Sequence, residues 1–497
     1  MAKPGKPKRT RPRIPRGFRD IAGSDVFARD RMIRRIREVY ERYGFMPLET
    51  PALEYVDCLG KFLPEADQPD AGIFALRDDD DEWVALRYDL TAPLSRYVAA
   101  HRDLPRPFRR YQVGPVYRVE KPGPDRFREF YQFDFDSVGT GSMLADAECA
   151  MIMCDTLEAL GIKPGEYIIR VNDRKVLNGV LEVMSAGAEL DPTVSLHVLR
   201  SIDKLDKVGP DGVRQLLGAG RKDESGAFIK GVALPANQID IIADYLSIVA
   251  GTRASVCDAL ASLVADSNVG REGVDELRQI DRALNDAGYT EDRVIFDPTV
   301  VRGLEYYTGP VFEGVLTFEI VDAKGAKRQF GSVFGGGRYD SLVERFTGQP
   351  MPATGASIGV DRLLAALKTL GKTEAQSTAA GVLVTRIDKD LTAEYQRLAI
   401  DLRSAGINTE LYVGKQSIGK QFKYADDCGK TVAVVMGSDE MHAGQVSLKD
   451  LRLGRELSKG IGDDRKRWLE EQPAQVSVDR GELVEAVQKI LARYSIG

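Results

Sequence analysis

The stretch that decides the fold runs from Gly114 to Asp136. It reads Gly-Pro-Val-Tyr-Arg-Val-Glu over 114–120, continues through a Pro/Gly loop, and resumes as Arg-Phe-Arg-Glu-Phe-Tyr-Gln-Phe-Asp-Phe-Asp over 126–136. Frequent aromatic and β-branched residues on both sides of the loop predict two antiparallel strands. Because side chains alternate between the two faces of a strand, Arg118 and Glu120 share one face of the first strand.

The even-numbered positions of the second strand also share a face. These residues are Arg126, Arg128, Phe130, Gln132, Asp134 and Asp136. So polar a surface around one phenylalanine is a poor core but a suitable floor for a charged ligand with a flat ring. Arginine holds phosphate or carboxylate through its two-pronged guanidinium group. A solvated sheet face with ion pairs is the alternative that the pattern leaves open.

A second polar and aromatic stretch is Arg302-Gly303-Leu304-Glu305-Tyr306-Tyr307. Two adjacent tyrosines on a strand point to opposite faces, so only one can enter a site unless the chain bends at Gly303. Aromatic packing on a strand is the alternative.

A third stretch combines three glycines, Gly335 to Gly337, with Arg338-Tyr339-Asp340 and a later Gly359-Val360-Asp361-Arg362. Glycines allow a backbone to approach a ligand closely. An arginine in the first turn of a helix opposes the helix dipole, so Arg362 indicates an anion site. A turn followed by a surface arginine is the alternative.

The 497 residues predict two to four domains. We expect the strand-rich segments 20–172 and 291–370 to form one domain, interrupted by a mostly helical insertion over 173–290. A polar linker over 371–380 leads to a domain over 381–497, in which short strands alternate with helices around a largely parallel core.

The segment Met1–Arg19 carries eight Lys or Arg and no acid, although the chain as a whole has a net charge of −6. Four prolines block a helix there and no apolar core follows, so neither a secretory signal nor a transit peptide is expected. We predict a flexible basic arm, either solubilising or in contact with phosphates. No apolar run is long enough to predict a membrane span.

The five cysteines are scattered and form no CxxC pair, and only three histidines are present. This argues against a disulfide framework or a structural zinc site and fits a reducing cytoplasm. His101, His197 and His442 lie outside the polar stretches, so an enzyme of this sequence would work through arginines, carboxylates and substrate positioning.

Together these segments resemble the class II aminoacyl-tRNA synthetases, and specifically the histidyl family. The stretches 43–51, 114–136 and 355–364 are similar to motifs 1, 2 and 3 of the class, of which the first supports dimer formation. The stretch 302–307 resembles the histidyl signature, 172–174 and 203–207 look like the family, and the tail resembles its anticodon-binding domain. The resemblance implies an α+β catalytic domain on an antiparallel sheet with a helical insertion and a C-terminal α/β domain.

The resemblance also implies site residues. Those for ATP are Arg118, Glu120, Arg126, Phe130 and Arg362. Those for histidine are Asp89, Leu90, Thr91, Arg118, Gln132, Asp136, Arg302, Tyr306, Tyr307 and Tyr339. Among them, Arg118 and Arg302 would act on the α-phosphate and are the implied catalytic residues, Asp136 and Tyr307 would hold the imidazole nitrogens, and Tyr339 would line the pocket.

The implied activity is ATP-dependent ligation of L-histidine to the 3′ end of histidine tRNA through a histidyl-adenylate, with Mg²⁺ accompanying ATP and no protein metal ligand assigned. A cytoplasmic homodimer without a membrane partner is expected. The loop 121–125 departs from the basic or Gln-bearing loop of the family, which puts the family's rule for the extra 5′ nucleotide of this tRNA in doubt.

Three other classes of protein stay open at this point. They are a regulatory paralogue of histidine biosynthesis, a non-catalytic tRNA-binding protein and another class II synthetase. Intact arginines and a tail domain argue against the first two, and the double tyrosine argues against the third.

Overall fold

The computed structural model describes residues 10–59, 72–123, 126–187, 190–223, 226–248, 251–301, 303, 306–321, 327–373, 378–458 and 474–494. The chain forms two compact units. The larger contains Met1–Asp20 and Arg29–Thr373, and the smaller contains Ile21–Ala28 and Glu374–Gly497.

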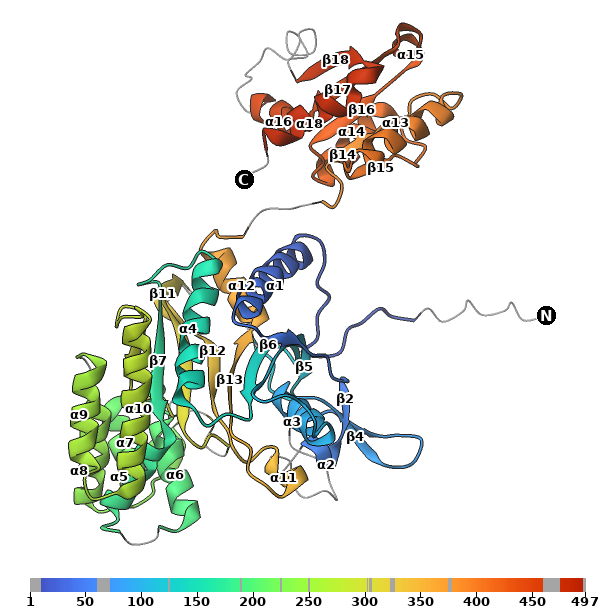
Figure 1. The fold of residues 1–497 in the computed structure, drawn as a ribbon. Coiled ribbons are helices and arrows are strands. Elements are labelled where there is room, and N and C mark those ends of the chain that lie inside the picture. The colour runs from blue at the N-terminus through green and yellow to red at the C-terminus, as the bar shows by residue number, and fades with distance from the viewer. Residues whose placement is uncertain are drawn as a thin grey trace. The chain divides into compact units, whose positions relative to one another are not determined.

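A large sheet forms the centre of the larger unit (Figure 1). Within the described residues it has eight strands, in the order β1 (Met46–Pro47), β5 (Phe108–Tyr117), β6 (Glu129–Val138), β13 (Ala353–Gly359), β12 (Lys327–Arg338), β11 (Pro310–Val321), β7 (Tyr167–Asp173) and β10 (Val294–Phe296). The two outer pairings are parallel and all others are antiparallel. The predicted antiparallel α+β fold is therefore confirmed.

The β5–β6 pair is the hairpin predicted from 114–136. Its register places Gln112 opposite Asp134 and Gly114 opposite Gln132. The odd-numbered residues of β6 face the core, where the rings of Phe133 and Phe135 each lie 4.9 Å from that of Tyr40 on α1 (Ser24–Arg42). Because these aromatic side chains fill one face, the even-numbered polar residues occupy the other.

Helices α4 (Met143–Ala159) and α12 (Val360–Thr369) also pack against the sheet. A smaller sheet follows the order β2 (Leu53–Tyr55), β4 (Trp83–Leu86) and β3 (Ala75–Arg77), with a turn between Asp78 and Glu82 that joins β3 to β4. The short helices near this sheet are α2 (Val56–Leu59), α3 (Thr91–Ala100) and α11 (Glu344–Thr347).

A helical region lies between β7 and β10 in the sequence and gathers at one end of the large sheet (Figure 1). Its elements are α5 (Arg174–Met184), α6 (Pro192–Ile202), α7 (Leu205–Leu217), β8 (Gly220–Lys222), β9 (Phe228–Lys230), α8 (Ala236–Ser247), α9 (Arg253–Leu263) and α10 (Asn268–Asp286). Its α10 packs against α4 and α5, which anchors the region to the sheet.

The smaller unit holds a sheet in the order β15 (Thr409–Leu411), β14 (Val382–Val384), β16 (Val432–Val435), β17 (Gln445–Asp450) and β18 (Gln475–Asp479). Its helices are α13 (Thr392–Ser404), α14 (Ile418–Asp427), α15 (Ser438–Ala443), α16 (Leu451–Ser458) and α18 (Leu483–Ala492), with a 3₁₀ turn at Arg480–Glu482. The α/β prediction holds, but β17 and β18 are antiparallel, so only the β15–β14–β16 part is parallel.

Parts of the predicted arm and linker, namely 1–9 and 374–377, lie outside the described residues. The described end of the arm makes two contacts with the larger unit. Gly17 accepts a backbone hydrogen bond from Arg128, and the Arg19 guanidinium pairs with Asp361 at 2.6 Å. These contacts attach the arm to the sheet region of the larger unit before residue 20. In the described part of the chain, no helix is both long and apolar enough to span a membrane.

Candidate active site

A cavity of about 760 Å³ lies over the polar face of β5 and β6. Its walls come from the β4–α3 region, the β5–β6 hairpin, the segment before β11, β12, and the junction of β13 with α12. Ten of the predicted site residues line it: Asp89, Thr91, Arg118, Glu120, Arg126, Phe130, Gln132, Tyr306, Tyr307 and Arg362. Residues far apart in the sequence therefore meet at one place.

In the cavity lining, the guanidinium group of Arg118 lies beside the ring of Phe130. The guanidinium carbon of Arg118 is 5.1 Å from the ring centre of Phe130, and its Nε donates to the Tyr88 carbonyl at 3.0 Å. Glu120 and Arg126 line the same cavity. Such a group can bind an anion next to a stacked planar ring.

The start of α12 adds a second charged group. Arg362 donates from Nη2 to the Phe330 carbonyl at 2.8 Å. The carboxylate of Asp361 accepts from the Tyr131 backbone N–H at 2.7 Å and pairs with Arg19 at 2.6 Å. Asp361 and Arg19 were not among the predicted site residues, although Asp361 directly precedes one that was.

The floor of the cavity is acidic. Asp89 accepts from the Ala92 backbone N–H at 3.0 Å, and burial raises its pKa against the opposing effect of that hydrogen bond and of Arg118. Burial also raises the pKa of Asp134 to about 7. Beside them, the Gln132 amide donates to Ser357 Oγ at 2.6 Å. This floor can hold cations or N–H donors. Sequence reasoning placed Asp134 on the correct face without giving it a role.

The two tyrosines both line the cavity, contrary to the prediction that a strand would direct only one of them inward. The chain turns here: Gly303 has a φ of +58°, and its carbonyl accepts from the Tyr306 and Tyr307 backbone N–H groups. The two rings lie 4.2 Å apart, and their hydroxyl groups are 3.0 Å apart. The bend at Gly303, which the sequence left as an exception, is what the structure has.

Three predicted histidine ligands lie behind the cavity wall and do not line it: Leu90, Asp136 and Tyr339. Asp136 pairs with the buried Arg110 at 2.7 Å and accepts from the Tyr339 hydroxyl group. Arg110 also donates to the Leu90 carbonyl at 3.0 Å. Interactions with Arg110 thus hold Asp136 and Leu90 in a supporting layer.

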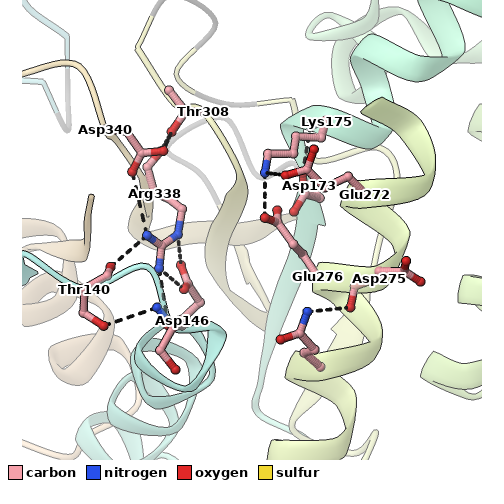
Figure 2. Close-up of polar contacts among 12 residues, drawn as sticks. Thr140, Asp146, Asp173, Lys175, Glu272, Asp275, Glu276, Thr308, Arg338 and Asp340 are labelled. Carbon is pink, nitrogen blue, oxygen red and sulfur yellow. Dashed lines mark hydrogen bonds and ion pairs between the residues drawn. The ribbon is translucent and has the colours of Figure 1, made fainter. Parts of the chain in front are cut away.

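A side-chain network and a backbone hydrogen bond hold the segment that follows the tyrosines, and Figure 2 shows the network, which includes Arg338. On one side the Thr308 hydroxyl group donates to Asp340 at 2.8 Å, and Arg338 forms a buried ion pair with Asp146 on α4. On the other side the Gly309 carbonyl accepts from the Arg174 backbone N–H at 2.9 Å. The ends of β7, β11 and β12 are thereby fixed to one another.

The network that Figure 2 shows beside α10 is built on Lys175. Its ammonium group lies 2.6 Å from both Glu272 and Glu276. Burial and the neighbouring Glu276 raise the pKa of Asp173 well above its usual value. This cluster joins α5 to α10 at the base of the helical region.

A second cavity, of about 710 Å³, shares Tyr306, Tyr307 and Gly335 with the first. Its other wall includes Asp203, Asp206 and Lys207, from the stretch 203–207 that was singled out in the sequence. The helical region therefore reaches the tyrosine side of the site.

Arg302, one of the two predicted catalytic residues, lies outside the described residues, as do Leu304, Glu305, Pro124 and Asp125. No group of three or more His, Cys, Asp or Glu side chains suited to a metal ion occurs in the part of the chain that the structure describes. None of the three histidines lines the larger cavity.

An antiparallel sheet that carries arginines and a stacking phenylalanine below an open cavity, with a separate α/β unit after it, is the arrangement of the class II aminoacyl-tRNA synthetases. Comparison with known proteins narrows this class. The family model for histidyl-tRNA synthetase matches residues 17–363, and the anticodon binding domain model matches residues 380–490. The chain belongs to the histidyl-tRNA synthetase family.

Individual relatives agree with the family models. The chain is 55% identical to a histidine–tRNA ligase of Rhizobium meliloti, covering 99% of this chain and 97% of that protein. It is 52% identical to that of Ruegeria pomeroyi over 100% of both chains. The crystal structure of histidyl-tRNA synthetase from Nostoc sp. superimposes with a TM-score of 0.75 at 31% identity, covering 98% of this chain and 100% of that one.

Proposed function

We propose that the protein uses ATP to activate L-histidine as histidyl-adenylate and then transfers the histidyl group to the 3′ end of histidine tRNA. The observation that carries the proposal is the convergence of ten predicted ligand residues on one cavity. Membership of the histidyl-tRNA synthetase family supports the same activity.

For ATP, Arg118 would bind the α-phosphate, Phe130 would stack on the adenine, and Glu120 would accept from its amino group. The closeness of Arg118 and Phe130 supports this assignment, because the α-phosphate and the base of a bent nucleotide lie near each other. Arg126 and Arg362 would hold the outer phosphates, since guanidinium groups bind phosphate oxygens in pairs.

For histidine, the carboxylate would lie at Arg118 and the amino group would meet Asp89, Thr91 and Gln132. All four line the cavity, and Asp89 brings negative charge to the side where an ammonium group would bind. Tyr306 and Tyr307 would flank the imidazole ring. From behind the wall, Leu90 and Asp136 would act through Arg110, and Tyr339 would act through Asp136.

The reaction needs little proton transfer, which agrees with a cavity wall without histidine. The histidine carboxylate attacks the α-phosphorus in line and pyrophosphate leaves, so positioning and charge stabilisation dominate. The guanidinium of Arg118 would neutralise charge that develops on the α-phosphate, together with Arg302. The terminal ribose hydroxyl of tRNA then attacks the mixed anhydride.

Mg²⁺ would accompany ATP and neutralise phosphate charge. The described lining includes the carboxylates of Glu120 and Asp361 as well as Arg126 and Arg362, and Asp361 is paired with Arg19. This set fits a cation that phosphate oxygens and water hold for the most part, which is the usual state of Mg²⁺ beside a nucleotide.

A homodimer and a cytoplasmic location complete the proposal. The stretch 43–51, similar to motif 1, and the neighbouring β2 expose large apolar side chains, with Met46 65% and Tyr55 49% exposed. Covering such a patch favours association. Charging of tRNA for translation places the enzyme where ribosomes work.

Amino-acid-dependent ATP–pyrophosphate exchange tests the proposal. With purified protein and each amino acid supplied singly, exchange is expected with histidine alone, and Arg302→Ala should lose most of it. Charging of histidine tRNA by the same protein tests the second step. Folded protein that exchanges with no amino acid at adequate Mg²⁺ would sink the proposal and favour the regulatory paralogue.

A further inference from the structure

The tripeptide 172–174, Asn-Asp-Arg, joins the carboxyl end of β7 to α5, and the proposed reaction gives it no role. Strand β10 runs parallel beside β7, and its last residue, Phe296, pairs with Val171. Asn172 is the next residue along β7, at the point where the chain leaves β10. The side chain of Asn172 therefore starts beside the segment that leads from β10 to the two tyrosines of the cavity.

The Asn172 amide donates to two backbone carbonyl groups of that segment. Asn172 is 2% exposed, and its Nδ2 donates to the Pro298 carbonyl at 3.1 Å and to the Val300 carbonyl at 3.0 Å. A buried carbonyl group that lacks a donor is costly, and Val300 is buried. One amide group thus fixes the path of the chain over residues 298–300.

The segment is a compact turn, so it moves as a unit. The Thr299 backbone N–H and hydroxyl group donate to the Asp297 carboxylate at 2.9 and 2.6 Å. The Val300 N–H donates to the Asp297 carbonyl at 3.1 Å, and the Asp297 N–H donates to the Val171 carbonyl at 2.8 Å. A change in the contacts of Asn172 would therefore shift the turn relative to β7.

The same tripeptide also holds the far end of the stretch that carries the tyrosines. The Arg174 backbone N–H donates to the Gly309 carbonyl at 2.9 Å, two residues after Tyr307. Between the two attachment points, the Gly303 carbonyl accepts from the N–H groups of Tyr306 and Tyr307. Both ends of the stretch that presents these rings to the cavity are thus attached to residues 172–174.

Tyr245 of α8 is a third partner of the Asn172 amide. The Asn172 Nδ2 donates to the Tyr245 hydroxyl oxygen at 2.9 Å, and Tyr245 is 0% exposed. Helix α8 belongs to the helical region and packs against α5. The hydroxyl group therefore limits the rotation of the amide and links the helical region to the turn.

We infer that Asn172 is a positioning residue for histidine binding: through the two carbonyl groups it sets the position of Tyr306 and Tyr307, and Tyr245 holds it in place. The inference rests on the proposed function, in which the tyrosines flank the imidazole ring, and deepens it. Neither Asn172 nor Tyr245 belongs to the described lining of the cavity. Both would therefore act through the turn and not on the ligand.

The two substrates should respond differently to a shift of the turn. The residues proposed for ATP come from the β5–β6 hairpin and the start of α12, whereas the tyrosines come from the stretch that Asn172 holds. Misplacement of a substrate by about 1 Å can cost about a hundredfold. Displaced tyrosines should therefore raise the KM for histidine alone. A smaller amount of folded protein would instead lower kcat and leave both KM values unchanged.

Steady-state ATP–pyrophosphate exchange separates these cases. The kcat and the KM values for histidine and ATP are measured for the wild type, Asn172→Ala and Tyr245→Phe. Asn172→Ala removes all three contacts. Tyr245→Phe removes one hydroxyl group and leaves the contacts with the carbonyl groups, so it tests the inference even where Asn172→Ala fails to fold. Tyr167→Phe is the matched control, because Tyr167 also lies on β7, is 0% exposed and donates to Glu158 at 2.6 Å.

We expect Asn172→Ala to raise the KM for histidine about tenfold to a hundredfold and Tyr245→Phe to raise it about twofold to fivefold. The KM for ATP should stay within about threefold of the wild type in both, and Tyr167→Phe should leave both KM values unchanged. An unchanged KM for histidine in Tyr245→Phe, or an equal rise for both substrates in either variant, would overturn the positioning role. Wild-type protein without histidine-dependent exchange would instead overturn the proposed function itself.

Discussion

Arg110 and Asp136 face each other across β5 and β6 and form a buried ion pair with an Nη2–Oδ2 distance of 2.7 Å. Their side chains are 0% and 4% exposed. The pair turns Asp136 away from the cavity and, through the Leu90 carbonyl, ties β5 to the start of α3. It is thus the structural support under the proposed histidine pocket.

Removal of the Arg110–Asp136 ion pair should lower the free energy of unfolding. In Arg110→Ala, Asp136 would remain buried without its counter-charge, which typically costs about 3–5 kcal/mol. Chemical unfolding of the purified wild type and variant measures this difference in the free energy of unfolding. Arg278→Ala is the control, because its partner Asp258 is largely exposed and such pairs contribute roughly 0–1 kcal/mol. Similar small losses for both variants would contradict a supporting role for Arg110.

Gly355 should be intolerant of a side chain. It pairs with Asp136 on β6, and a Cβ at this position would overlap the Asp136 carboxylate and the Phe135 carbonyl. We expect Gly355→Ala to cost about 1–3 kcal/mol and to raise the KM for histidine, since Asp136 must move. Gly141→Ala, where the added Cβ meets nothing within 4 Å, should leave both quantities close to wild type. Equal behaviour of the two variants would show that the backbone near Asp136 can adjust.

The raised pKa of Asp134 predicts a pH dependence of stability. Burial, Asp136 and Asp89 raise that pKa to about 7, while Arg110 and Ser357 lower it. The ordinary value is about 3.9, so the folded state binds the proton more tightly than the unfolded state. The contribution of this group to stability therefore falls as pH rises from about 4 to about 7.

The comparison with Asp134→Asn isolates this effect from other titrating groups. Relative to the wild type, the variant should become more stable as pH is raised from about 5 to about 8, because its amide does not ionise. Urea unfolding at both pH values without ligand gives the difference directly. A stability difference that is independent of pH would show that Asp134 keeps an ordinary pKa.

Much of the site could be predicted from sequence because strand periodicity assigns faces. The even-numbered residues of β6 do lie opposite the core, since Phe133 and Phe135 pack on Tyr40. The same periodicity cannot say how deep each residue lies. Asp134 and Asp136 have the same parity, and only the positions of Arg110 and Tyr339 place one in the wall and the other behind it.

Turns were harder to predict, because one residue changes the direction of a whole segment. The expectation for Tyr306 and Tyr307 assumed a strand, and the left-handed backbone of Gly303 replaced it with a turn. The contact of Arg19 with Asp361 joins residues 342 positions apart. No local pattern in the sequence predicts such a pairing.

The Arg19–Asp361 pair leads to a prediction about ATP. Arg19 also lies 3.7 Å from the ring centre of Phe127, which lines the cavity together with Asp361 and Arg362. In Arg19→Ala the Asp361 carboxylate would keep the Tyr131 N–H but lose its counter-charge, and it would repel phosphate beside Arg362. We expect the KM for ATP in the exchange reaction to rise about twofold to tenfold with little change in the KM for histidine, as for a loss of about 0.4–1.4 kcal/mol in ATP binding alone.

Arg16→Ala serves as the control, because Arg16 is an exposed basic residue of the same segment. This variant should leave both KM values unchanged. If both variants raise the KM for ATP equally, the effect comes from the general positive charge of the segment, and the specific pair with Asp361 has no part in it.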